Sequence, residues 1–312
     1  MWADLVGQRV VVRRVVGERD GRPLFSDVIG ELVSGDDPLT VRRTDGSMVR
    51  VDAGSVHRIK PIPGRRPDPL ELEEIAAAGW PAAETRWLGR WLLRAADGWT
   101  GRANSVLPLG DPGEPLDVAV ESVRRWYADR GLAARFQVPL PVATGLDAEL
   151  ADRGFRADPP VLVQTAALPT LLARATDRTD LPEVVFDETP SSDWLAAYHY
   201  RGGSDLPAVA VGVMTAARLP VFASVVIDGE TVAVARAVVD EGWLGVTAVE
   251  VAPAWRRRGL ASHVMRGLAR WGTDHDATQS YLQVASDNHA AVAFYERLGY
   301  TTHHRYHYRI AD

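Results

Sequence analysis

Short runs of alternating apolar and polar residues fill the first sixty positions, the pattern of β-strands with one buried face. Strand-like runs occupy residues 8–15, 27–33, 39–43, 48–52 and 56–61. Between the third and fourth runs, Thr44-Asp45-Gly46-Ser47 predicts a hairpin turn. Five strands in so short a segment predict a small all-β barrel.

Proline and glycine then interrupt the pattern. Residues 62–69 contain three prolines and one glycine, the composition of a linker. We therefore place an SH3-like barrel at residues 1–62 and a linker at 63–69. A helix is expected over 70–78, because Asp-Pro precedes it and Gly79 ends it. The apolar run 87–96 predicts a second helix.

Residues 116–168 and 262–310 repeat one pattern at an offset of about 145 residues. The matching segments are Arg125-Trp126 with Arg270-Trp271, Phe136-Gln137-Val138 with Leu282-Gln283-Val284, and Arg153-Gly154-Phe155 with Leu298-Gly299-Tyr300. Each copy reads helix, strand, helix, Gly-aromatic, strand. A repeat of this length predicts a duplicated domain, with one copy in residues 70–180 and the other in 181–312.

The second copy contains the clearest binding signal of the chain, in residues 246–261. A β-branched run ends at Pro253, which has no N–H for a strand ladder, and a basic turn and an amphipathic segment follow. The first amides of a helix are unpaired and lie at the positive end of its dipole, and guanidinium groups suit phosphate oxygens. The residues expected to hold a phosphate are Arg256, Arg257, Arg258, Gly259, Leu260 and Ala261.

Arg256-x-x-Gly259-x-Ala261 resembles the acyl-CoA pyrophosphate loop of GCN5-related N-acetyltransferases (GNAT). The later block from Asn288 to Tyr300 resembles that family's closing signature: an asparagine at a strand exit, a helix carrying a tyrosine, and Gly-aromatic at its end. Gly299 is the expected left-handed helix terminator. The resemblance implies an α/β (α+β) GNAT fold with a mixed central sheet. The order of the predicted domains along the chain resembles that of actinobacterial GNAT proteins, which have an N-terminal SH3-like domain and are often labelled histone-acetyltransferase-like.

The first copy lacks both features of the second. Its first helix is preceded by the acidic, proline-broken segment 110–115, and Glu149 or Leu150 stands where the second copy has Tyr295. We therefore expect a degenerate copy that does not hold pyrophosphate but packs against the intact copy and shapes the acceptor cleft.

The resemblance also implies roles for single residues. The main chains of Val249 and Val251 would pair with the pantetheine arm of acetyl-CoA, and one amide would polarise the thioester carbonyl. Tyr295 matches the tyrosine that protonates the departing thiolate; a core tyrosine beside Phe294 is the alternative. Asn288 matches a cofactor contact, and it also suits a helix N-cap.

Glu250 is the candidate general base, because a charged residue in a central strand costs energy unless it is used or paired. By simple alternation it faces away from Val249 and Val251, and a bulge would turn it toward the cleft. The alternatives are Thr247, Asp240, Glu241 and a relayed water. Histidines at 303, 304 and 307 alternate along the last strand. They could hold a metal, but a solvated or core-facing strand explains them better, so we predict no metal.

Composition narrows the class of protein. With 46% apolar and 24% charged residues the chain reads as an ordinary globular protein, and it has no cysteine. An acetyl-cysteine intermediate is therefore excluded, and acetyl transfer should be direct. No run approaches the ~18–20 apolar residues of a membrane helix, and no signal peptide is recognised. We expect a cytoplasmic protein without membrane contact. The net charge of −6 makes nucleic acid an unlikely partner.

These observations predict an acetyl-CoA-dependent N-acetyltransferase that acts on a small-molecule or protein amine through a ternary complex. The alternatives are a CoA-binding sensor or adaptor without turnover and a nucleic-acid-associated protein acetyltransferase. A homodimer is compatible with the sequence. Acidic residues in the acceptor-side segments hint at a cationic acceptor, although a solvated acidic face explains them as well: Asp187, Glu188, Asp193, Asp205, Asp228 and Glu230.

Overall fold

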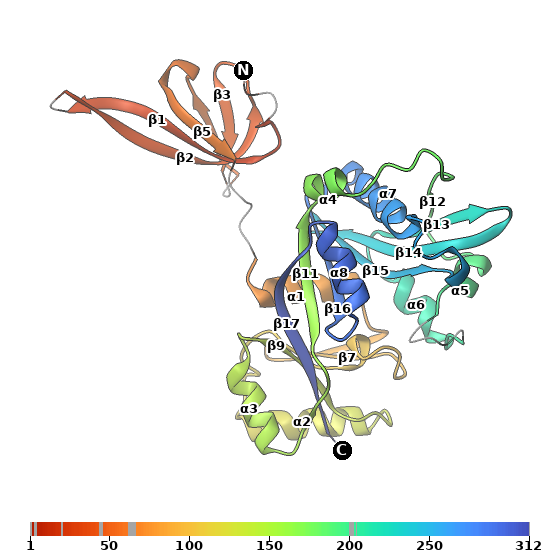
Figure 1. Cartoon of the computed structure of the whole chain (residues 1–312). Coiled ribbons are helices and arrows are strands. Elements are labelled where there is room, and N and C mark those ends of the chain that lie inside the picture. The colour runs from red at the N-terminus through yellow and green to blue at the C-terminus, as the bar shows by residue number, and fades with distance from the viewer. Residues whose placement is uncertain are drawn as a thin grey trace. The chain divides into compact units, whose positions relative to one another are not determined.

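The chain forms two compact units, Met1–Pro67 and Asp68–Asp312 (Figure 1). The computed structural model describes residues 2, 5–19, 21–43, 46–61, 67–199, 203 and 205–311. Each unit has its own apolar core and is described by itself. In the part of the chain that the structure describes, no helix is long and apolar enough to cross a membrane.

The first unit is one antiparallel sheet in the order β4-β3-β2-β1-β5. Its strands are β1 (Arg9–Arg19), β2 (Arg22–Ser34), β3 (Leu39–Arg42), β4 (Met48–Val51) and β5 (Val56–Pro61), with a 3-10 turn, η2 (Ala53–Ser55), before β5. The predicted all-β module is confirmed. No recorded pairing joins β4 to β5 among the described residues, so the sheet is open rather than a closed barrel. Thr44 and Asp45 of the predicted turn lie outside the described residues.

The second unit begins with α1 (Pro69–Gly79), whose N-cap Asp68 accepts from two amides of the first turn. A three-stranded sheet follows, β6 (Glu84–Leu88), β7 (Trp91–Ala95) and β8 (Leu107–Pro108), with η3 (Arg102–Asn104) before β8. The helix predicted over 87–96 is therefore wrong. The run is apolar because β7 is largely buried on both faces, and such a run has no periodicity that separates strand from helix.

The repeat predicted from the sequence is present in the structure. The first copy runs α2 (Leu116–Ala128), β9 (Arg135–Leu140), α3 (Thr144–Asp152), β10 (Arg156–Ala157) and β11 (Val161–Ala167). The second runs α7 (Leu260–Asp274), β16 (Gln279–Ala285), α8 (His289–Arg297) and β17 (Thr301–Ile310). The order helix, strand, helix, strand is the same in both.

The Gly-aromatic pairs agree in detail between the copies. Gly154 and Gly299 both adopt left-handed backbone, with φ of 82° and 97°. The amide of Phe155 donates to the carbonyl five residues earlier at 3.0 Å, and the amide of Tyr300 does the same at 3.1 Å. Both aromatic side chains are buried. The two helices therefore end by the same local mechanism, as expected of a duplication.

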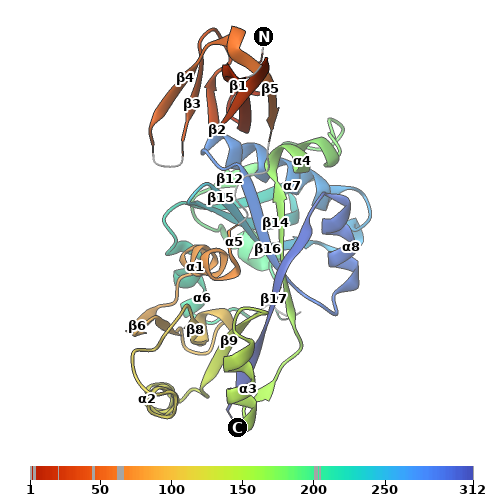
Figure 2. The ribbon, with the colours of Figure 1, turned by 90° about the vertical axis from the view of Figure 1, so that its left-hand side faces the viewer.

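One mixed sheet of nine strands joins the copies. Its order is β10-β17-β11-β16-β15-β14-β13-β12, and β9 also pairs with β17. Among the described strands of this sheet, only the β15–β16 pairing is parallel. The remaining elements are α4 (Leu168–Arg174), β12 (Val185–Asp187), α5 (Ser192–Ala197), α6 (Val209–Thr215), β13 (Pro220–Ile227), β14 (Glu230–Asp240) and β15 (Trp243–Val251). Helices α4, α7 and α8 pack on one face and α1, α5 and α6 on the other (Figure 2). The predicted mixed sheet is confirmed.

The copies exchange their last strands. β11 of the first copy lies between β16 and β17 of the second, and the C-terminal half of β17 pairs with β9 of the first. Neither copy completes its sheet without the other, and for this reason residues 68–312 form one unit.

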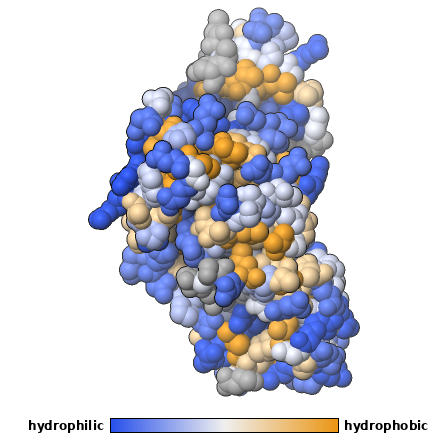
Figure 3. Space-filling view, turned by 90° about the vertical axis from the view of Figure 1, so that its right-hand side faces the viewer, coloured by the Kyte–Doolittle hydropathy of each residue, from blue (hydrophilic) through white to orange (hydrophobic). Residues whose placement is uncertain are grey.

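The other edge of the sheet ends in the three-residue strand β12. Val185, Phe186 and Val226, which lie near this edge, are 36–48% exposed. On the side of the molecule that Figure 3 faces, apolar side chains form small groups among hydrophilic ones. A very short edge strand offers few free backbone groups for pairing with another chain.

Candidate active site

Strands β15 and β16 separate in the middle of the sheet. They pair in parallel from Trp243 with Gln279 to Val246 with Leu282. Beyond that point β15 continues to Val251 beside β14, and β16 continues beside β11. The two strands therefore diverge and leave an opening in the sheet, whose edges carry backbone groups that can pair with an extended ligand.

A β-bulge in β15 lies at this opening. Val234 pairs with Glu250 but Arg236 pairs with Thr247, so one extra residue stands in β15. Ala248 takes a left-handed φ of 55° there, which is uncommon outside glycine.

The bulge reverses the side-chain alternation beyond it. Val246 before the bulge and Val249 and Val251 after it all pack against the core cluster that contains Tyr295. Glu250 therefore lies on the opposite face of the sheet. A bulge is present, as the prediction of a cleft-facing Glu250 required, but it lies before Val249, and Glu250 still faces away from Val249 and Val251 as simple alternation predicts.

Glu250 is held by a residue that the sequence did not suggest. The backbone N–H of His199 donates to Oε2 of Glu250 at 2.8 Å, and Nδ1 of His199 lies 3.0 Å from Oε1. The two side chains are 21% and 39% exposed, Glu250 being the more buried. A lone histidine after a short helix has no motif, so only the fold brings the pair together. Water can still reach this carboxylate.

The other base candidates lie elsewhere or have other partners. Asp240 and Glu241 stand at the turn between β14 and β15, at the far end of β15 from the opening. The Thr247 hydroxyl accepts from buried Arg236 at 3.4 Å. Nε2 of His304 lies 3.0 Å from Oε1 of Glu73, and Nε2 of His307 lies 2.5 Å from Oδ1 of Asp147. Each of these two imidazole rings therefore already has a carboxylate partner.

The predicted phosphate loop is a tight and exposed bend. A 3-10 turn, η4 (Pro253–Trp255), leads into three arginines, all exposed, and α7 follows. Arg257 and Gly259 have positive φ of 62° and 86°. No side chain caps the first amides of α7, which leaves them available to an anion. Arg258 lies over the Trp255 ring at 4.7 Å.

A fourth arginine joins this loop from a distant part of the sequence. Nη1 of Arg178 donates to the carbonyl oxygen of Arg258 at 2.6 Å, while its other nitrogens bind Asp180 at 2.6 and 2.7 Å. The Arg178 guanidinium holds the pKa of Asp180 at about 2. A Cβ on Gly259 would lie 2.2 Å from Nη1 of Arg178. Any larger residue at position 259 would therefore be strained by the left-handed φ and would require Arg178 to move. No motif in the sequence indicated Arg178.

Tyr295 and Asn288 lie on α8 and at its start. Tyr295 is half-buried and packs on the Phe294 and Tyr300 rings, with centroids at 5.2 and 5.8 Å. Burial raises the pKa of Tyr295 to about 12. Asn288 caps the helix, its Oδ1 accepting from the amide of Ala291 at 3.2 Å. The cap does not preclude a ligand contact, because the residue is exposed.

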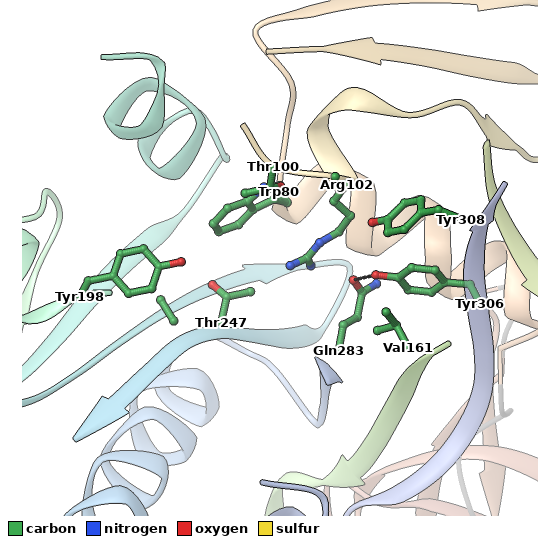
Figure 4. Close-up of a pocket in the computed structure, with 11 residues that line it drawn as sticks. Trp80, Thr100, Arg102, Val161, Tyr198, Thr247, Gln283, Tyr306 and Tyr308 are labelled. Atoms are coloured by element: carbon green, nitrogen blue, oxygen red, sulfur yellow. Dashed lines mark hydrogen bonds between the residues drawn. The ribbon is translucent and has the colours of Figure 1, made fainter. Parts of the chain in front are cut away.

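A cavity of about 200 Å³ opens on the face of the sheet that bears Glu250. It is lined by Trp80, Thr100, Gly101, Arg102, Val161, Tyr198, Thr247, Ala248, Gln283, Tyr306 and Tyr308 (Figure 4). Thr247 and Ala248 belong to β15 and Gln283 to β16, so the cavity lies where these strands separate. Residues from both halves of residues 70–312 contribute to the lining. Arg102, Trp80 and the tyrosines were not predicted as site residues.

Comparisons with known proteins agree with this geometry. The family model described as "Probable histone acetyltransferase Rv0428c C-terminal" matches residues 70–309, and "Rv0428c N-terminal Sm-like domain" matches residues 5–60. The N-terminal match names an Sm-like rather than an SH3-like domain, which is compatible with five antiparallel strands.

Two curated relatives match over most of their length. The chain is 31% identical to the probable histone acetyltransferase Rv0428c of Mycobacterium tuberculosis (strain ATCC 25618 / H37Rv), over 98% of this chain and 95% of that protein. It is 30% identical to the uncharacterized N-acetyltransferase YobR of Bacillus subtilis (strain 168), over 78% of this chain and 98% of that protein.

Solved structures support the fold. A GCN5-related N-acetyltransferase from Kribbella flavida matches with a TM-score of 0.56 and 18% identity, over 78% of this chain and 95% of that chain. A tandem GNAT protein from the clavulanic acid biosynthesis pathway matches with a TM-score of 0.53 and 14% identity, over 80% and 89%. The chain therefore belongs to the Rv0428c family of GCN5-related N-acetyltransferases and is an acetyltransferase.

Proposed function

We propose that this protein transfers the acetyl group of acetyl-CoA directly to an amine while both substrates are bound. The observation that carries the proposal is the opening between β15 and β16 beside the uncapped N-terminus of α7. These two features offer an extended ligand a strand edge at one end and an anion site at the other.

The residues of the opening and the loop fit the parts of CoA. The amides from Gly259 to Ala261 and the guanidinium groups of residues 256–258 suit the pyrophosphate, because charged and backbone donors converge at an exposed helix start. The backbones of Val249 and Val251 suit the pantetheine arm, and Asn288 lies at the start of the neighbouring helix α8. When bound, acetyl-CoA supplies the activated thioester.

In this proposal, groups of the protein stabilise the transition state and remove the amine proton. The amine nitrogen forms the new C–N bond and the C–S bond breaks. An amide of β15 beside the opening would stabilise the oxyanion, a contribution of about 3 kcal/mol for one such donor. Glu250, oriented by His199, takes the amine proton, directly or through water.

Tyr295 is the proposed donor to the leaving sulfur. Because burial raises its pKa to about 12, the phenol stays protonated at neutral pH. Transfer to a thiolate of pKa ~8.5 is unfavourable in isolation, so the proton has to move as the C–S bond breaks. The chain contains no cysteine, so an acetyl-cysteine intermediate cannot form and the transfer is direct.

The proposal is tested by release of free thiol from acetyl-CoA in the presence of a panel of amines, together with calorimetry of CoA binding. We expect heat with CoA and thiol release with at least one amine. Binding of CoA without release from any amine would favour the sensor hypothesis. Absence of heat with every CoA species would remove the basis of the loop assignment.

A further inference from the structure

The cavity beside the strand opening has a cationic group that no acid of the described chain neutralises. In Figure 4 the Arg102 guanidinium points into the middle of the cavity, between Thr247 and Gln283. It lies 5.1 Å from the centre of the Trp80 ring. No carboxylate among the described residues lies within ion-pair distance of Arg102.

A second arginine lies close to the same ring. The Arg236 guanidinium is 4.9 Å from the centre of Trp80 and fully buried. Its nitrogens donate to the carbonyl oxygens of Met214 at 2.7 Å and Gly79 at 3.1 Å rather than to a carboxylate. Desolvation lowers the pKa of Arg236 to about 9, with a smaller contribution from Arg102. Arg236 therefore remains a cation at neutral pH and adds positive potential at the cavity wall.

The other polar groups of the wall are uncharged. The described residues that line the cavity include hydroxyl groups and one carboxamide but no aspartate or glutamate. Two acids that adjoin the lining residues have other partners. Glu73 lies behind Gln283 at 3.4 Å and also binds His304 and Gln137, and Glu250 is held by His199. An anionic group in the cavity would thus meet unpaired positive charge and neutral donors.

The acidic residues that hinted at a cationic acceptor do not line this cavity. All are exposed at the surface of the unit, as a solvated acidic face requires: Asp187, Glu188, Asp193, Asp205, Asp228 and Glu230.

We infer that the acceptor is a small amine of the amino-acid class, whose own carboxylate binds Arg102. The inference rests on the proposed acetyl transfer and adds the substrate class. A volume of about 200 Å³ is below the ~300–1,000 Å³ of pockets for drug-sized ligands, so the acceptor is small. Trp80, Tyr198 and Tyr306 offer rings to an apolar or aromatic body.

The groups at the two ends of the cavity determine the orientation of the proposed acceptor. Arg102 holds the carboxylate, and the amine points toward Thr247 and Ala248, where β15 and β16 separate and where the thioester is proposed to lie. Glu250 stands two residues further along β15 on the same face. A polyamine would instead place like charge against Arg102.

The experiment compares matched acceptors in the thiol-release assay. Phenylalanine is set against phenethylamine, which lacks only the carboxylate, and against the phosphonate analogue of phenylalanine. A second set uses leucine and isopentylamine. We expect kcat/KM at least tenfold higher for the amino acid in at least one set, because one charged hydrogen bond is worth about 10- to 100-fold.

Variants at Arg102 test the contact itself. Arg102→Leu should reduce the ratio of kcat/KM between amino acid and matched amine about 10- to 100-fold. Arg102→Lys should keep part of the ratio, and Arg102→Glu should invert it. Because a ratio within one protein does not depend on the folded fraction, it separates binding from a structural role. Arg125→Leu, an exposed residue of α2 outside the cavity lining, is the control and should leave the ratio unchanged.

Each contrary result has a distinct meaning. Equal use of amino acid and matched amine in both sets, a ratio unchanged in Arg102→Leu, or a preference for the phosphonate would overturn the amino-acid inference while acetyl transfer stands. No thiol release with any amine would overturn both proposals. Calorimetry with CoA on the Arg102 variants should give wild-type affinity, which shows that the CoA loop is intact.

Discussion

Replacing Gly259 by alanine tests the phosphate loop through a change of one methyl group. The residue has a φ of 86°, where an L-residue costs about 1–2 kcal/mol. The new Cβ would also lie 2.2 Å from Nη1 of Arg178, so the arginine must move and give up its bond to the carbonyl of Arg258. The backbone strain alone should lower Tm by about 2–8 °C in a unit of this size.

The chain offers a matched control for the strain. Gly229, at the turn between β13 and β14, has a φ of 81°, and its Cβ would meet nothing within 4 Å. Gly229→Ala should therefore lower Tm by a similar amount and leave CoA binding unchanged. In Gly259→Ala the CoA dissociation constant should rise about tenfold or more, because the bend loses its bond to Arg178 and the shifted amides would no longer face the proposed pyrophosphate. Calorimetry with CoA measures the difference.

Removing the obstructing side chain separates the two effects. Arg178→Ala in the Gly259→Ala background leaves the strain but removes the steric conflict, so Tm should recover in part. Equal loss of CoA affinity in Gly229→Ala and Gly259→Ala, or no loss in either, would show that the bend does not hold the pyrophosphate.

Four further predictions concern single side chains. Tyr295→Phe should lower kcat about 10²- to 10⁴-fold in the thiol-release assay and leave CoA affinity unchanged. The pKa of Tyr295 is about 12 in the folded protein and ~10 in the unfolded chain, so its contribution to stability is complete below pH ~10 and is lost as the pH rises toward 12. Urea unfolding at a series of pH values measures this loss. A loss that begins below pH 9 would contradict the prediction. Glu250→Gln should lower kcat more than His199→Ala, while the KM for acetyl-CoA stays constant in both; an unchanged kcat in Glu250→Gln would remove it as the base. Glu73→Ala should lower the free energy of unfolding by about 1–3 kcal/mol in urea unfolding, because it leaves His304 and Gln137 without their buried hydrogen-bond partner; a cost below ~0.5 kcal/mol would contradict a central role.

Local signals in the sequence predicted the local parts of the site. Gly299 was recognised because a left-handed backbone at the end of a helix favours glycine, and Gly259 was recognised because it belongs to the short Arg-x-x-Gly-x-Ala motif before a helix. Arg178, His199 and Arg102 were missed for the opposite reason. Arg178 meets Arg258 80 residues away, and His199 meets Glu250 51 residues away. Nothing in the neighbouring sequence of these residues specifies their partners.

The bulge at Ala248 marks the limit of pattern reasoning in a strand. Side chains alternate with a period of two, so one inserted residue moves every later side chain to the other face. The run 246–251 reads as a continuous strand, and the insertion is visible only in its pairing with β14. Alternation places Glu250 opposite Val249 and Val251, but the bulge that also places it opposite Val246 could not be derived from the sequence.

The strand exchange explains the structural role of the first copy, which has no phosphate loop. Gln137 and Gln283 are equivalent positions of the repeat, and both donate to Glu73, at 2.7 and 3.4 Å. The first copy also supplies β11 beside β16, and the segment that contains Trp80 and Arg102 supplies four of the eleven residues that line the cavity. In the proposed function CoA binding needs only the loop of the second copy, whereas the sheet is completed by strands of both copies and the proposed acceptor cavity is lined by side chains of both. Substitutions in the first copy should therefore act on the acceptor rather than on CoA.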